Sequence, residues 1–145
     1  MSREKIDFPK RIDKINYDLL DKIIDICIKE DLQDIGDITS RTLFNNSNIS
    51  KKAFLIAKEN GIICGVDIFS YVYKKFDNNI IIKKLRKDGD IVNKNDVVVE
   101  IEGNVLSIIE GERIALNFIQ FMSGISTKVN NLVKLIEKYN TKLLD

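Results

Sequence analysis

The sequence predicts an α+β protein in which helices flank a small, mostly antiparallel sheet and a long helix follows. Two separate segments repeat apolar residues at helical spacing, and a third, longer one occupies the C-terminal part of the chain. Between them lie short apolar segments bounded by turn pairs such as Asn60-Gly61 and Asp88-Gly89. Such turns usually join antiparallel strands, so a mostly antiparallel sheet is expected.

The first helix is expected from Tyr17 to Glu30, where apolar residues recur every three or four positions. Either Asn16 or Asp18 can cap its start, because both side chains accept hydrogen bonds from backbone N–H groups. The stretch 30–44 is then loop-like, with Gly36 as its clearest turn signal. Within it, Asp37 and Thr39 are expected to stabilise a turn rather than to bind a ligand.

Short strands and one more helix are expected in the middle of the chain. Residues 66–76 return to a helical period. The Asn60-Gly61 pair predicts a hairpin between the first two strands, and Gly103-Asn104 predicts a turn before the last. The strands are expected at 53–58, 62–64, 80–85, 97–101 and 105–109.

The last helix is expected from Gly111 to about Tyr139, with Arg113 at its entrance. At 100° per residue, five residues fall within an arc of about 80° and form a polar seam. Almost every other side chain from 114 to 125 is apolar, which predicts burial on most sides of the helix. Its second half is amphipathic. The seam consists of Arg113, Asn117, Gln120, Gly124 and Thr127.

Arg113 allows two interpretations on residue chemistry alone. Its planar guanidinium can bind a carboxylate or phosphate through two hydrogen bonds. It can equally form a salt bridge with Glu110, with Glu112 or with an acid elsewhere in the chain. Both interpretations stay open at this point.

Composition excludes or disfavours several classes of protein. The chain has no histidine, which excludes a Ser/His or Cys/His nucleophilic pair and any histidine metal site within it. Its 23 basic and 22 acidic residues give a net charge of +1, which disfavours nucleic-acid binding. The longest uncharged run, 114–127, is too short to span a membrane. Cys27 and Cys64 are expected as buried thiols, which favours a cytoplasmic protein.

Four segments together resemble a known family. ERIALNFIQFMSGIST (112–127) is similar to the E-R-x-A-L-N-x-x-x-x-x-S-G-I-[AS]-T signature of quinolinate phosphoribosyltransferases, also called carboxylating nicotinate-nucleotide pyrophosphorylases. EDLQDIGDITS, AKENGIICG and KDGDIVNKNDVVVEIEG match three further motifs of the family in the same order. Two departures stand out: the stretch 33–35, and Asn95 where the family usually has glycine.

The resemblance implies a domain organisation. Residues 1–111 would form an N-terminal α/β sandwich domain, and 112–145 would form the linking helix and first strand of an α/β barrel. In the family, KLLD (142–145) begins that strand and a Thr-Arg-Lys motif follows it. Because this sequence ends at Asp145, the resemblance implies a truncated barrel.

The resemblance also implies an activity and a set of partners. The family transfers phosphoribosyl from phosphoribosyl pyrophosphate to quinolinate and forms nicotinate mononucleotide, pyrophosphate and CO2, for NAD biosynthesis. The reaction requires Mg2+, and no metal ligand or catalytic residue is expected within this chain. The family implies a homodimer or higher oligomer in which Arg113 contacts the dicarboxylate across the subunit boundary. Glu112 and Asn117 are expected to support Arg113, and Ser123 with Gly124 to form a close packing point.

Three other interpretations remain open. A relative associated with molybdenum transport, or a nicotinate phosphoribosyltransferase that does not decarboxylate, would share the architecture. The chain could also be a non-catalytic remnant or dimerisation module. A biotinyl or lipoyl carrier is disfavoured, because no lysine lies at the Gly103-Asn104 tip.

Overall fold

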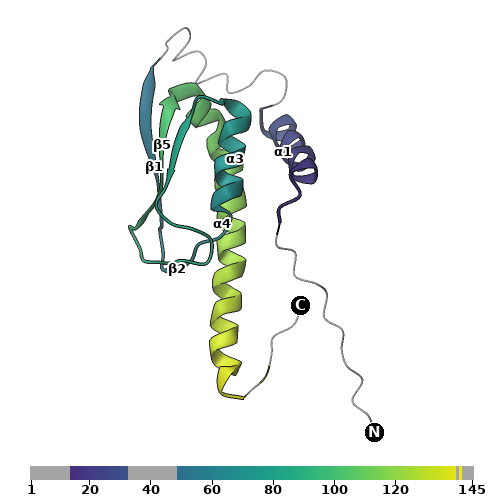
Figure 1. The fold of residues 1–145 in the computed structure, drawn as a ribbon, viewed down its shortest axis with the longest axis vertical. Coiled ribbons are helices and arrows are strands. Elements are labelled where there is room, and N and C mark those ends of the chain that lie inside the picture. Colours follow the sequence, from purple (N-terminus) through teal and green to yellow (C-terminus); the bar gives the residue numbers. More distant parts are fainter. Residues whose placement is uncertain (1–13, 33–48, 140, 142–145) are drawn as a thin grey trace.

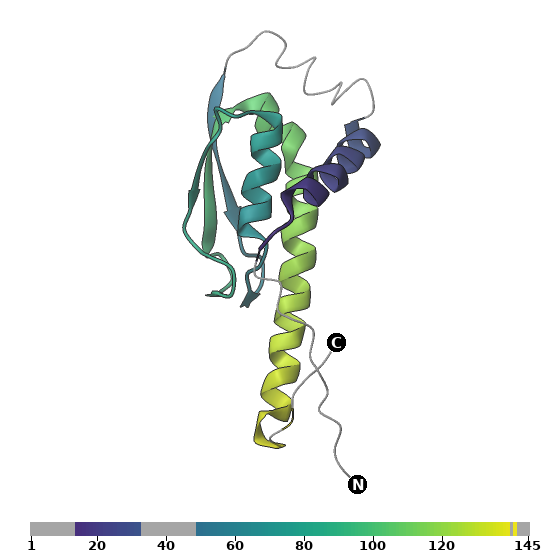
Figure 2. The same ribbon diagram turned by 45° about the vertical axis from the view of Figure 1, so that its right-hand side comes forward.

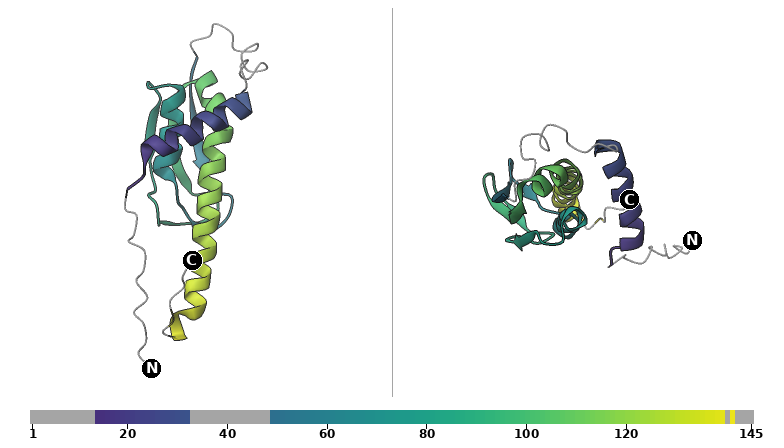
Figure 3. Two further views of the ribbon diagram at one scale, coloured as in Figure 1. Left: turned by 90° about the vertical axis from the view of Figure 1, so that its right-hand side faces the viewer. Right: turned by 90° about the horizontal axis from the view of Figure 1, so that it is seen from above.

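A computed structural model describes residues 14–32, 49–139 and 141, and these residues form three layers. A sheet packs on one side of a pair of helices, and a further helix crosses the opposite side (Figure 1; Figure 3, right). The elements, in chain order, are α1 (Tyr17–Leu32), β1 (Ser50–Ile56), β2 (Gly61–Ile62), α3 (Val66–Phe76), β3 (Ile81–Lys84), β4 (Ile91–Val92), β5 (Val97–Asn104), α4 (Val105–Ile136) and the 3-10 turn η1 (Glu137–Tyr139).

The main sheet has the strand order β1-β5-β3, and both pairings are antiparallel. From Val99 to Glu102 its central strand alternates in the way that a half-buried strand requires. Val99 and Ile101 are buried under the helices. Glu100 and Glu102 face outward, where Lys83 and Lys52 pair with them at 3.2 and 3.3 Å. The antiparallel sheet, its flanking helices and the long final helix confirm the predicted fold class.

The predicted hairpin between 53–58 and 62–64 is wrong. β2 pairs with β4 in a separate two-stranded ribbon, with Gly61 opposite Val92. Asn60 lies in a bend just before β2, and its side chain accepts a hydrogen bond from the backbone N–H of Lys94 at 2.8 Å. That bond directs the chain toward the segment after β4 instead of back along β1.

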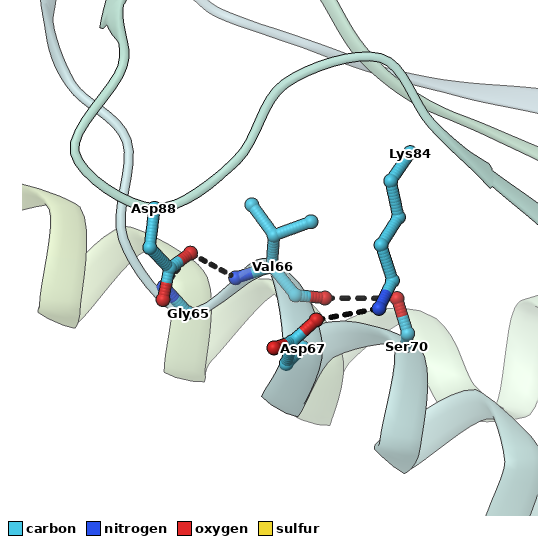
Figure 4. Close-up of polar contacts among 6 residues, drawn as sticks. All are labelled: Gly65, Val66, Asp67, Ser70, Lys84 and Asp88. Carbon is cyan, nitrogen blue, oxygen red and sulfur yellow. Dashed lines mark hydrogen bonds and ion pairs between the residues drawn. The ribbon is translucent and has the colours of Figure 1, made fainter. Parts of the chain in front are cut away.

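Helix α3 begins where predicted, and a carboxylate from another segment caps it. Asp88 accepts hydrogen bonds from the backbone N–H groups of Gly65 and Val66, both at 2.9 Å (Figure 4). These N–H groups have no partner within the helix, and a negative charge is favourable at a helix N-terminus. Ser70 donates back to the carbonyl oxygen of Val66, and Lys84 pairs with Asp67 in the first turn.

Helix α4 starts six residues earlier than predicted, so the strand predicted at 105–109 is wrong. Asn104 ends β5 and caps the helix, because its side chain accepts a hydrogen bond from the N–H of Leu106 at 2.9 Å. The predicted turn at Gly103-Asn104 is thus a strand-to-helix junction. The β-branched residues after it are helical because one of their faces packs on the core, where Ile108 is buried.

Gly111 therefore lies inside α4, not at its start. A Cβ atom at this position would lie 2.9 Å from Cδ1 of Tyr73 and 3.2 Å from Cδ2 of Phe76. A separation of 2.9 Å is closer than real Cβ atoms come to other carbons, so a side chain here would push α3 away from α4. The glycine lets the two helices pack closely.

Helix α1 crosses α4 on the side away from the sheet (Figure 2; Figure 3, left). Asn16 caps it by accepting from the N–H of Leu19 at 3.1 Å, which confirms one of the two predicted caps. Leu20 and Ile24 are buried against the body of the protein. Cys27 and Cys64 are half-buried and free, so the expectation of fully buried thiols is not met. Asp37, Thr39 and KLLD lie outside the described residues.

The glycines of α4 give a matched pair for a stability measurement. Gly111→Ala should lower the free energy of unfolding by about 1–3 kcal/mol, because the added methyl group overpacks the contact with Tyr73. Gly124→Ala should raise it by about 0.5–1 kcal/mol, because alanine favours a helix and no other described segment comes within 4 Å of the new Cβ. Urea unfolding followed by circular dichroism measures both. Equal effects at the two positions would contradict the close contact at Gly111.

Asn95 has a φ of 74°, in the left-handed region that glycine adopts most easily. The equivalent position of a matching turn is Gly89, with a φ of 91°. Asn95→Gly should therefore leave stability unchanged or slightly higher, and Asn95→Val should cost about 1–2 kcal/mol. Lys94→Val, one residue earlier, is the control and should change the unfolding free energy by less than about 0.5 kcal/mol. A harmless Asn95→Val would show that the turn is not strained.

Candidate functional site: the groove between α1 and α4

A groove of about 980 Å³ lies between the C-terminal half of α1 and the middle of α4. Its apolar walls come from both helices, and its polar groups gather around Arg113. Helix α1 contributes Ile23, Cys27, Glu30 and Asp31, and α4 contributes Arg113, Ile114, Asn117, Phe118, Gln120 and Phe121. An apolar groove with a few convergent polar groups is the usual form of a small-molecule site.

The charged centre of the groove is an ion pair between the two helices. The NH1 atom of Arg113 lies 2.7 Å from Oδ1 of Asp31, across 82 positions of sequence. The two partners differ in exposure: 75% of the Arg113 side chain is exposed, but only 18% of the Asp31 side chain. The carboxylate thus holds the guanidinium from the protein side, and much of the guanidinium surface remains accessible from outside.

Asp31 and Glu30 lie in the last turn of α1, where the helix dipole disfavours negative charge. The Arg113 guanidinium offsets this cost for Asp31, because an ion pair places a full positive charge next to it. The salt bridge expected for Arg113 with an acid elsewhere in the chain is therefore present. Binding of an external anion by Arg113 stays a prediction, since an exposed guanidinium with five donors can bond to both.

Of the two residues predicted to support Arg113, one lines the groove and the other does not. Asn117 lines the groove one turn beyond Arg113, as the seam predicts. Glu112 does not line the groove. Because α4 begins at Val105, Glu112 lies inside the helix and not near its N-terminus, where the predicted start at Gly111 would have placed it. Its charge acts on the other side of the helix: burial, and then the negative charge of Glu112, raise the pKa of Tyr73.

Asp31 is the residue that the sequence analysis missed. It belongs to the EDLQDIGDITS motif, so the resemblance did mark the segment. Two acids at the end of a predicted helix were the available signal, because such a position needs a cation. Nothing in the spacing of the motifs indicated that the cation would be Arg113.

Thr127, the last residue of the seam, and the nearby Ser123 have a structural function. Ser123 accepts from the N–H of Cys64 at 3.0 Å and donates to its carbonyl oxygen at 3.1 Å, and Thr127 accepts from the N–H of Ile62 at 2.9 Å. Four residues along a helix rise about 6 Å and two along a strand about 6.6 Å, so the hydroxyls match alternate residues. Ser123 is thus a packing point, as predicted, whereas Gly124 contacts no other described segment.

Two further observations limit the chemistry of this part of the chain. Within the described ranges 14–32 and 49–139, no group of three or more His, Cys, Asp or Glu residues is placed to hold a metal ion. No helix in the same ranges is long and apolar enough to cross a membrane.

Comparison with known proteins decides the family. The model of the family described as "Quinolinate phosphoribosyl transferase, N-terminal domain" matches residues 37–123. The chain belongs to the quinolinate phosphoribosyltransferase family. It is 32% identical over 131 residues to the probable nicotinate-nucleotide pyrophosphorylase [carboxylating] of Bacillus subtilis, covering 90% of this chain and 44% of that protein. A chloroplastic enzyme of the same name from Arabidopsis thaliana is 35% identical over 111 residues, which are 77% of this chain and 31% of that protein.

Solved structures of family members confirm the fold. The nicotinate-nucleotide pyrophosphorylase from Francisella tularensis is 40% identical with a TM-score of 0.87, covering 95% of this chain and 48% of that one. NadC from Streptococcus pyogenes is 30% identical with a TM-score of 0.79, covering 85% and 44%. The chain therefore spans about half or less of the length of the relatives that it matches. The division at residue 111 stays a prediction, and α4 runs unbroken across it.

A polar network holds α1, and with it Asp31, against α3. The Tyr71 hydroxyl donates to Asp21 at 2.8 Å, and the Lys75 ammonium lies 3.1 Å from Asp21 and 3.0 Å from Asp25. The hydrogen bonds from Tyr71 and Lys75 lower the pKa of Asp21. The hydrogen bond to Asp21 raises the pKa of Tyr71, and the carboxylates of Asp25 and Asp21 raise the pKa of Lys75.

This network predicts that α1 is held most firmly between about pH 4 and pH 10. Asp21 stabilises the docked helix above its unfolded pKa, and this contribution is lost as the pH falls through the lowered folded value. Tyr71 and Lys75 stabilise the docked helix below their unfolded pKa values. This contribution is lost as the pH rises through their raised folded pKa values. Amide hydrogen exchange in α1, corrected for its intrinsic pH dependence, measures the effect. Tyr71→Phe should weaken the dependence at both ends; an unchanged profile would show that the network does not hold α1.

Proposed function

We propose that this chain is the N-terminal part of a quinolinate phosphoribosyltransferase, which forms nicotinate mononucleotide for NAD biosynthesis. The reaction joins the phosphoribosyl group of phosphoribosyl pyrophosphate to the ring nitrogen of quinolinate, with loss of pyrophosphate and CO2. The observation that carries the proposal is the accessible guanidinium of Arg113 in a groove, within the segment that the family model matches. A cytoplasmic location belongs to the same proposal, supported by two free cysteines.

Arg113 is proposed to bind a carboxylate of quinolinate. The substrate carries two adjacent carboxylates and must approach a second polyanion, and two like charges at 4 Å repel by about 4 kcal/mol in a partly exposed site. Cations must offset this repulsion in the ground state and the transition state. A guanidinium suits the task better than an ammonium, because its fork can donate two parallel hydrogen bonds to one carboxylate.

The described residues do not provide a magnesium site. Mg2+ is part of the proposal as a requirement of the whole enzyme, with its ligands outside the described residues. This chain's contribution is to bind and orient the dicarboxylate.

The second half of α4 supports a further part of the proposal, that the rest of the enzyme and a second subunit cover this helix. It extends beyond the sheet and α3 (Figure 1). Large apolar side chains are exposed along it, led by Phe121 at 71%. Contiguous exposed apolar surface usually marks an interface. The set is Phe121, Ile125, Val129, Leu132, Val133 and Leu135. A homodimer or higher oligomer, with Arg113 reaching the partner's site, fits this surface.

The first test is made on an enzyme that fuses residues 1–145 to the C-terminal part of the Francisella tularensis relative. Arg113→Ala should raise the KM for quinolinate about 100-fold, because a charge-assisted hydrogen bond to the substrate is lost. The KM for phosphoribosyl pyrophosphate should stay within about twofold. Lys128→Ala removes a cation from the same helix and serves as the control. Purified 1–145 alone should form no nicotinate mononucleotide.

Two results would contradict the proposal. Product formation by 1–145 alone, above background, would show that the chain does not need a second part. An unchanged quinolinate KM in Arg113→Ala would remove the role of the groove in substrate binding.

A further inference from the structure

We infer that Asp31 is a positioning residue for Arg113: it holds the guanidinium through NH1 so that the remaining donors face an incoming carboxylate. The inference rests on the proposed function, in which Arg113 binds the dicarboxylate. It concerns a residue to which neither the family resemblance nor the sequence pattern assigned a role.

The geometry of the ion pair supports holding rather than blocking. The 2.7 Å bond joins one oxygen of Asp31 to one terminal nitrogen of Arg113. A guanidinium has five N–H donors in one rigid plane, so a single bond at NH1 restrains the group and leaves its other donors available. Asp31 is largely buried whereas most of the Arg113 side chain is exposed, so the carboxylate occupies the inner side of the fork.

Such a hold matters because a free arginine side chain samples many rotamers. A ligand that binds it must first fix it, and the lost conformational freedom weakens binding. A side chain that is already fixed avoids this loss. Helix α1 is a firm base for the purpose, because Leu20 and Ile24 are buried and Lys75 bonds to Asp21.

In the opposite role, Asp31 would compete with an incoming carboxylate for Arg113. The negative charge of Asp31 makes this a definite alternative. Among the described residues, the groove is lined by two acids, Glu30 and Asp31, and by one cation, Arg113. A carboxylate that displaced Asp31 would bind better once that acid were neutralised. The two roles therefore predict opposite changes in the KM for quinolinate. Positioning predicts that Asp31→Asn and Asp31→Ala each raise this KM, and competition predicts that each lowers it.

The test is a double-mutant cycle in the fusion enzyme that contains residues 1–145. Asp31→Ala should raise the KM for quinolinate on the order of tenfold, since misplacing a binding group costs about this much or more. The kcat and the KM for phosphoribosyl pyrophosphate should stay within about twofold. Asp31→Glu should restore part of the affinity. In the Arg113→Ala background, Asp31→Ala should have no further effect, because the group that it positions is gone.

Asp25→Asn is the matched control for Asp31→Asn. Asp25 lies on the same helix and pairs with Lys75 at 3.0 Å, and it does not line the groove. This change weakens the network that holds α1 but leaves the bond between Asp31 and Arg113 in place. It should therefore raise the quinolinate KM much less than Asp31→Asn does, so a general loosening of α1 can be separated from the loss of the hold on Arg113.

The outcomes separate this inference from the proposed function. If Arg113→Ala leaves the KM unchanged, the proposed substrate contact fails and the inference falls with it. If Arg113→Ala raises the KM but Asp31→Ala leaves or lowers it, the proposed function stands and the inference is overturned. A second measurement needs no activity. In NMR spectra of 1–145, rotation about the Nε–Cζ bond of Arg113 should be slow, and Asp31→Asn should make this rotation fast. Unchanged rotation would also overturn the inference.

Discussion

The close approach of α3 to α4 at Gly111 is the contact on which the rest of the arrangement depends. With no side chain at this position, Tyr73 and Phe76 pack directly on the backbone of α4, and both helices can cover the sheet. The contact also fixes the rotation of α4 about its axis. Arg113 lies two residues further, a turn of about 200°, so it must face away from α3 and toward α1. The position of the groove is thus a consequence of where a glycine falls in the helix.

The ion pair between Asp31 and Arg113 joins two segments that the family motifs mark separately. Neither partner is well placed on its own: an acid in the last turn of a helix opposes the dipole, and an exposed arginine has no fixed direction. Together they make one oriented cation at the mouth of an apolar groove. The network around Asp21 extends the same logic, because it fixes the helix that carries the acid.

Periodicity predicted the helices well and the connections poorly. The spacing of apolar residues located α1 and α3, since a buried stripe must recur every three or four positions. It failed at 105–109, where β-branched residues suggested a strand but the side chain of Asn104 starts a helix. It also failed at the Asn60-Gly61 hairpin, because a bond from the distant Lys94 decides the pairing. For the site, the motifs located Arg113 and Asn117. They did not identify Asp31 as the partner of Arg113, because that pairing depends on how α1 crosses α4, which no local pattern encodes.

The hydroxyls of Ser123 and Thr127 have a consequence for how the protein behaves in a concentrated solution. In the β2 segment, Ile63 bonds toward Gly89 and Asp90, while the backbone of Ile62 and Cys64 points the other way. Left open, those groups would form a free strand edge that could pair with a strand of another molecule. The two hydroxyls occupy them instead. In other sheets an extra strand or a lysine protects such an edge. In this ribbon the helix α4 covers it, which disfavours edge-to-edge aggregation.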